Sequence, residues 1–175
     1  MAAEVPDIPR PSQLWKQLSA ERKQQAADAF WSDDNAAAEQ AEAITLIAHR
    51  LKFRTKSVVA LPREKKVRHL LGLPQPLMPE IVAARLLVAY HLAQQRPMMA
   101  SFLDALGIKH EDGLIEDEET AAPEPERLQE AAKTIAASFP AEDVALYLST
   151  LVWQDPETWG KLSDAPETRA ATTQP

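Results

Sequence analysis

The chain of 175 residues contains no cysteine. Without thiols it can form no disulfide, carry no thiolate nucleophile and build no cysteine-ligated zinc or iron–sulfur centre. Glycine is nearly as scarce, and the four that occur lie at or near the ends of periodic segments: Gly72, Gly107, Gly113 and Gly160. Such spacing excludes a glycine-rich phosphate loop and a dinucleotide-binding fingerprint.

A long apolar run is also absent. The most apolar stretch, residues 81–93, is interrupted by Arg85 and His91. It is also shorter than the roughly 18 residues that a transmembrane helix needs. The N-terminal residues lack the basic start and apolar core of a signal peptide. We therefore expect a protein of the cytoplasm that does not associate with membranes.

The apolar residues that are present favour helix. They are mainly alanine and leucine, and they recur at three- and four-residue spacing. Several segments open on a proline, which suits the first helical position because its missing N–H costs nothing there. The pattern predicts an all-α protein, a single irregular or orthogonal domain of about seven or eight helices. The unequal helix lengths argue against a regular four-helix bundle.

The predicted domain spans residues 11–163. It follows a flexible N-terminal lead, residues 1–10, and precedes a tail, residues 164–175, whose Ala, Thr and Pro content is typical of disorder. An acidic loop, residues 109–125, interrupts the helical pattern. Within that loop we expect Leu114 and Ile115 to anchor the chain to the body of the domain. Residues 57–61 fit either an extended connection or a short turn, because a residue before proline avoids the helical region.

One predicted helix, residues 79–95, has no wide polar face. A helix that is apolar nearly all round is usually buried, so we expect the other helices to surround this one. After Arg96 and Pro97 a second helix follows, with an apolar stripe that ends at Leu106. Gly107 is placed for the left-handed position that ends a helix in a Schellman motif.

The strongest signal in the sequence is a basic segment, residues 50–68, within a chain of net charge −7. Such asymmetry can mark a surface that binds nucleic acid or another polyanion. The simpler interpretation, which we prefer, is that the segment faces the protein's own acidic loop. Phe53 is the only aromatic residue in it, so a base-stacking surface is not indicated. The basic residues are Arg50, Lys52, Arg54, Lys56, Arg63, Lys65, Lys66 and Arg68.

Three polar residues of the central helix are a second candidate site. Glu80, Arg85 and His91 interrupt an otherwise apolar pattern, and burial makes such groups costly unless they are paired. We expect them to form a buried structural network. The alternative is a small-ligand or enzymatic site built around them.

No nucleophile–base constellation stands out, so we predict no catalytic residues. The acidic loop lacks the alternating oxygen ligands of a calcium-binding loop, and we expect neither a metal nor a cofactor. The favoured function is a non-enzymatic interaction or scaffold module whose partner is another protein. Nothing in the sequence indicates an oligomeric state.

Overall fold

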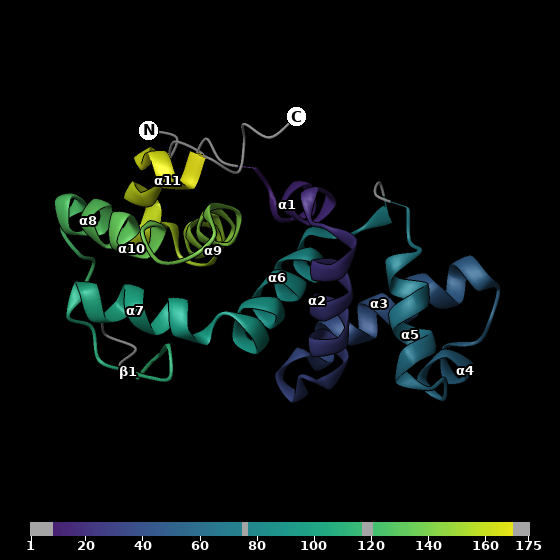
Figure 1. Cartoon of the computed structure of the whole chain (residues 1–175). Helices are drawn as coiled ribbons and strands as arrows, with labels where there is room; N and C mark the ends of the chain where they lie inside the picture. Colours follow the sequence, from purple (N-terminus) through teal and green to yellow (C-terminus); the bar gives the residue numbers. More distant parts are fainter. Residues whose placement is uncertain (1–8, 75–76, 117–120, 170–175) are drawn as a thin grey trace. The chain divides into compact units, whose positions relative to one another are not determined.

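The computed structural model describes residues 9–74, 77–116 and 121–169 (Figure 1). Within these ranges the chain is helical apart from one two-stranded hairpin, which confirms the all-α class. Eight of the eleven described α-helices have seven or more residues, close to the predicted number, and the other three are about one turn long. The chain divides into two compact units, which we call the N-terminal unit (Pro11–Gln94) and the C-terminal unit (Met1–Arg10 with Gln95–Pro175).

The N-terminal unit is organised around α6. This helix packs most extensively against α2, and also against α1 and α3. Its buried residues include Val82, Leu86 and Tyr90, whereas Ile81 remains half exposed. The helix predicted over residues 79–95 is therefore confirmed as the central helix of the N-terminal unit. The helices of this unit are α1 (Pro11–Gln17), α2 (Ala20–Ser32), α3 (Ala37–Leu51), α4 (Thr55–Val59), α5 (Arg63–Leu71) and α6 (Glu80–Gln94), with a 3-10 turn, η1 (Asp34–Ala36).

The segment that the sequence left undecided forms the short helix α4. Its backbone closes one turn, since the N–H groups of Ser57 and Val58 both reach the carbonyl of Arg54. Val58 is fully buried, and the burial of this side chain favours the turn over an extended strand. The proline rule restricts only Leu61, which lies beyond the end of the helix.

The C-terminal unit contains α7 (Arg96–Leu106), β1 (His110–Glu111), β2 (Leu114–Ile115), α8 (Pro125–Ala136), α9 (Ala141–Gln154), α10 (Pro156–Trp159), the 3-10 helix η3 (Gly160–Asp164) and α11 (Pro166–Arg169). Helix α7 packs on α8, and α9 contacts α8, α10 and α11. Phe102 lies edge-on to Tyr147, with ring centroids 5.6 Å apart, and 6.0 Å from Trp159. These rings join α7, α9 and α10 in one core.

Helix α9 is strongly buried, as α6 is. The sequence pattern did not predict this burial. Its residues are buried without a break from Asp143 to Val152. Ser149 and Thr150 make the sequence look partly polar. The Thr150 hydroxyl, however, donates to the Leu146 carbonyl at 2.7 Å, so its polarity is satisfied inside the helix.

The predicted disordered tail is wrong for residues 164–169. This stretch includes the end of η3 and all of α11, and Ala165 and Thr168 are fully buried. Their small side chains pack closely, and Pro166 starts a helix as proline often does. Composition alone suggested disorder because it does not report this packing. Residues 170–175 of the predicted tail lie outside the described part of the chain.

A hydrogen bond holds Pro9, the first residue of the N-terminal lead that the structure describes. Trp153 Nε1 donates to the Pro9 carbonyl at 2.7 Å, across 144 positions of sequence. Residues 1–8, the rest of the predicted flexible lead, lie outside the described ranges.

Helix α7 ends as predicted. Gly107 is left-handed, with φ +70°. Its N–H reaches the Asp104 carbonyl, and the Ile108 N–H reaches the Leu103 carbonyl, both at 3.0 Å. These two hydrogen bonds define a Schellman motif.

The first part of the predicted acidic loop is a hairpin. His110 pairs with Ile115 and Glu111 with Leu114. Asp112 and Gly113 form the two-residue turn, with φ +51° and +88°. Positive φ at both positions is typical of a type I′ turn, and Asp-Gly is among its preferred sequences. This dipeptide was the sequence signal for the hairpin.

Gly113, and not the pair Leu114 and Ile115, holds the hairpin to the unit, which corrects our expectation. Leu114 and Ile115 are 44% and 39% exposed, whereas Gly113 is buried. A Cβ added at Gly113 would lie 2.8 Å from Met99 Cβ and 3.2 Å from the Arg96 carbonyl oxygen. The hairpin backbone therefore contacts α7 more closely than any side chain would allow.

We predict that Gly113→Ala destabilises the protein by about 1–3 kcal/mol, because the new methyl group overpacks the contact and the backbone is left-handed. Gly160→Ala is the matched control, since nothing lies within 4 Å of an added Cβ and the backbone is right-handed there. Urea unfolding measures both variants. Equal stability of the two would contradict the packing role of Gly113.

A second prediction concerns Asp155, which caps α10. Its carboxylate accepts from the Thr158 hydroxyl at 2.6 Å and from the Thr158 N–H at 3.2 Å, and these hydrogen bonds lower the pKa of Asp155. A lowered folded-state pKa means that the cap's contribution is complete above the ordinary carboxyl pKa and is lost as pH falls through the folded value. Asp155→Asn should retain an acceptor and flatten this acid dependence, whereas Asp155→Ala should lose the cap at every pH. Trp159 fluorescence during acid titration, compared among the three proteins, measures the effect.

Candidate interaction surface

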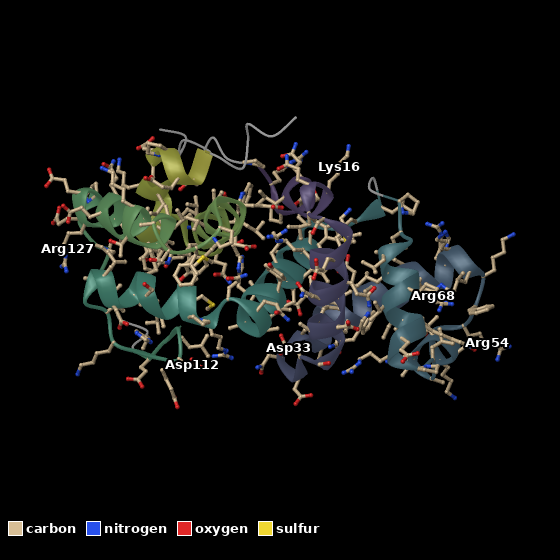
Figure 2. The ribbon with its side chains drawn as sticks, in the orientation of Figure 1. Lys16, Asp33, Arg54, Arg68, Asp112 and Arg127 are labelled. Atoms are coloured by element: carbon tan, nitrogen blue, oxygen red, sulfur yellow. The ribbon has the colours of Figure 1, made fainter. Side chains whose placement is uncertain are left out.

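The predicted basic segment folds into one part of the N-terminal unit, which we call the basic lobe (residues 50–68). It comprises the end of α3 with α4 and most of α5, and α3 packs against both other helices. Figure 2 labels Arg54, which precedes α4, and Arg68, on α5. The fold thus gathers the eight basic side chains on neighbouring elements.

Three of the eight basic residues support the fold. Arg50 donates to the Gly72 carbonyl at 2.5 Å, which satisfies an acceptor at the end of α5. Arg63 donates to the Ser32 hydroxyl at 2.5 Å. Lys66 lies 5.3 Å from the centroid of the Trp31 ring, within range of a cation–π interaction. The last two contacts join α5 to the end of α2.

The other five basic residues extend into solvent. Each is exposed, and none makes a hydrogen bond or ion pair with a described residue of the N-terminal unit. The only acidic residue in the same stretch of sequence is Glu64. The basic lobe therefore presents positive charge that its own unit does not neutralise. These five residues are Lys52, Arg54, Lys56, Lys65 and Arg68.

Two apolar side chains are exposed within the same lobe. Phe53 is 52% exposed and Val59 is 56% exposed. Phe53 follows Lys52, which ends α3 in a left-handed conformation with φ +56°. The Phe53 N–H bonds to the Ala48 carbonyl at 2.9 Å, which fixes the backbone that carries the ring. The lobe thus combines unpaired cations with apolar groups.

A hollow of about 150 Å³ lies at the edge of the lobe, lined by Ile47, Arg50, Leu51, Arg68, His69 and Gly72. It sits at the C-terminal ends of α3 and α5, where the helix dipoles are negative and disfavour a bound anion. Arg50 already binds one of these terminal carbonyls. We therefore assign Arg50 to the neutralisation of these helix ends and do not regard the hollow as an anion site.

Glu80, Arg85 and His91 do not form the common buried group that the sequence suggested. Glu80 is exposed and accepts hydrogen bonds from the N–H and hydroxyl of Ser12, at the start of α1. Arg85, partly exposed, pairs with Glu39 at 3.5 Å and donates to the Asn35 carbonyl at 3.1 Å.

Of the three, only His91 is buried, with its ring beside that of Tyr90. Glu80 thus fastens α6 to α1, and Arg85 fastens it to η1 and α3. No sequence spacing signals these contacts, because their partners lie 68, 46 and 50 positions away in the chain.

Comparison with known proteins gives no further assignment: no family model, no curated protein and no solved structure matches the chain. Among the described residues, no helix is long and apolar enough to cross a membrane. The described part of the chain also holds no group of three or more His, Asp or Glu side chains arranged to bind a metal ion.

The left-handed Lys52 generates a stability prediction. Lys52→Gly should raise the free energy of unfolding by about 0.5–1 kcal/mol, because glycine has no Cβ to clash at positive φ. Lys56→Gly removes the same charge from within α4, where glycine should instead cost up to about 1 kcal/mol. Thermal unfolding of the two variants should give shifts of opposite sign. A loss of stability in both would refute the strain at Lys52.

Proposed function

We propose that the protein is a non-enzymatic interaction module that binds an acidic, partly apolar protein surface through the basic lobe. The observation that carries this proposal is the combination of five exposed cations with the exposed side chains of Phe53 and Val59. Cations provide steering and specificity, and apolar groups provide the area whose burial stabilises a complex. The proposed compartment is the cytoplasm.

An acidic protein fits this surface better than a nucleic acid does. Phosphate contacts need only cations, and single-stranded bases need aromatic platforms. The lobe offers one aromatic ring, and Val59 has no role in either kind of contact. Protein interfaces, in contrast, combine an apolar centre with a charged rim.

An enzymatic role has less support. Glu80 and Arg85 are engaged in contacts that hold α1, η1 and α3 to α6. Residues with such structural roles are poor candidates for binding a substrate, because the unit would lose those contacts. This supports a structural role for both residues.

The test uses two acidic peptides that differ only in having leucines or serines among their glutamates, together with duplex DNA and single-stranded RNA. The leucine peptide should bind most tightly, and salt should weaken its binding. Arg54→Glu with Lys56→Glu should abolish binding because it reverses the charge beside Phe53. The control is Lys16→Glu, an exposed charge on α1 outside the lobe.

A second variant tests the apolar contribution. Phe53→Ser with Val59→Ser should remove the preference for leucine over serine while retaining salt-sensitive binding. If either nucleic acid binds more tightly than both peptides, and this variant binds it as well as the unmodified protein does, the lobe is a phosphate-binding surface and the proposal is wrong.

A further inference from the structure

The hairpin of the C-terminal unit presents a second surface of mixed character, which we call the acidic hairpin (residues 110–116). Leu114 and Ile115 are exposed on it, and exposed carboxylates flank them at Glu111, Asp112 and Glu116. Asp112 lies at its turn, as Figure 2 shows. Adjacent exposed aliphatic side chains that are rimmed by charged groups can mark a site of contact with another chain.

This surface is held firmly. His110 accepts from the Gly113 N–H at 3.1 Å through one ring nitrogen, and its other nitrogen lies 2.6 Å from the Asp104 carboxylate. Arg96 donates to the Asp112 carbonyl at 3.3 Å. Because Gly113 and His110 provide the attachment, Leu114 and Ile115 are available for another contact. A pre-ordered surface loses less entropy when it binds.

The basic lobe and the acidic hairpin are complementary. Each carries two exposed apolar side chains, and the charges around them have opposite sign. Together the two surfaces account for four of the six large apolar side chains that are exposed in the described ranges. Of the remaining two, Leu77 precedes α6 and Ile81 lies in its first turn.

We infer that the acidic hairpin of one copy binds the basic lobe of a second copy. The inference rests on the proposed function and names its partner: an acidic surface with aliphatic side chains, supplied by the chain itself. The two contacting surfaces differ, so the contact is heterologous, and each bound copy keeps a free lobe or a free hairpin. Association therefore continues beyond a dimer unless the chain of copies closes into a ring.

The contact is small and weak. Each side offers a few residues, which places it among transient interfaces of less than about 1,200 Å². Its charges are exposed, so salt should weaken it as the screening length falls from about 10 Å at 0.1 M to about 3 Å at 1 M. The average mass of the full-length protein in sedimentation should therefore rise with protein concentration at low salt.

A charge swap tests the inference on the full chain. One variant, Arg54→Glu with Lys56→Glu, places two carboxylates beside the exposed Phe53 and Val59 of the lobe. The other, Glu111→Lys with Glu116→Lys, makes the hairpin basic. Each variant alone should lose self-association by at least about tenfold, because the introduced charges repel those that face them on the other surface. Their mixture should recover it, since the new glutamates of one variant then face the new lysines of the other, and the unmodified lobe faces the unmodified hairpin.

The control variants are Lys16→Glu and Glu130→Lys, which reverse exposed charges on α1 and α8 outside both surfaces. They should associate like the unmodified protein. If both controls weaken association as strongly as the two paired variants do, association depends on net charge alone. That result would overturn the inference.

Cross-linking of lysines to carboxylates, in an equal mixture of isotopically light and heavy protein, identifies the chains in contact. Links between the lobe and the hairpin should include mixed light–heavy pairs. Links within single chains only, or a mass that stays monomeric at every concentration, would sink the inference. If copies do not associate but the leucine peptide still binds the lobe, only the self-partner is wrong; if the peptide also fails, the proposed function falls with it.

Discussion

The burial of α6 is the constraint on which the N-terminal unit depends. A helix with almost no polar face must be covered on most sides, and α1, α2 and α3 provide this cover. Glu80 and Arg85 then lie at the margins of the covered surface, where each binds a neighbouring element. Helix α1, with only seven residues, is too short to be stable alone. The Glu80 carboxylate at its start and the burial of Leu14 and Trp15 explain why it forms.

Much of this arrangement could be predicted from residue patterns. Pro79 and the apolar run after it predict α6, and Gly107 with its neighbours predicts the Schellman ending of α7. The less accurate predictions share one physical cause, since each depended on packing that composition does not report. Thr150 looks polar in the sequence, but its hydroxyl forms a hydrogen bond inside α9. Ala165 lies in a stretch whose composition suggests disorder, but its side chain is fully buried.

The basic lobe shows the same limit at the level of function. Net charge along the sequence located it, but could not tell which cations would be free. That distinction depends on partners that the fold brings from 22 to 35 positions away in the chain. They are the Gly72 carbonyl for Arg50, the Ser32 hydroxyl for Arg63 and the Trp31 ring for Lys66. Phe53 is the single aromatic residue of this segment in the sequence. The structure adds that it follows the left-handed Lys52, which ends α3.

The division of the chain also bears on the order in which it folds during synthesis. The hydrogen bond from Trp153 to Pro9 places the beginning of the described chain in the C-terminal unit, so residues 11–94 are a topological insertion between two parts of that unit. All helices that surround α6 are therefore complete once Gln94 has emerged from the ribosome. The C-terminal unit must wait for Trp153 before the Pro9 carbonyl acquires its hydrogen-bond partner, and domains generally fold as units as they are made. The C-terminal unit thus needs a segment that is synthesised before the inserted unit, although most of its own residues are synthesised after it.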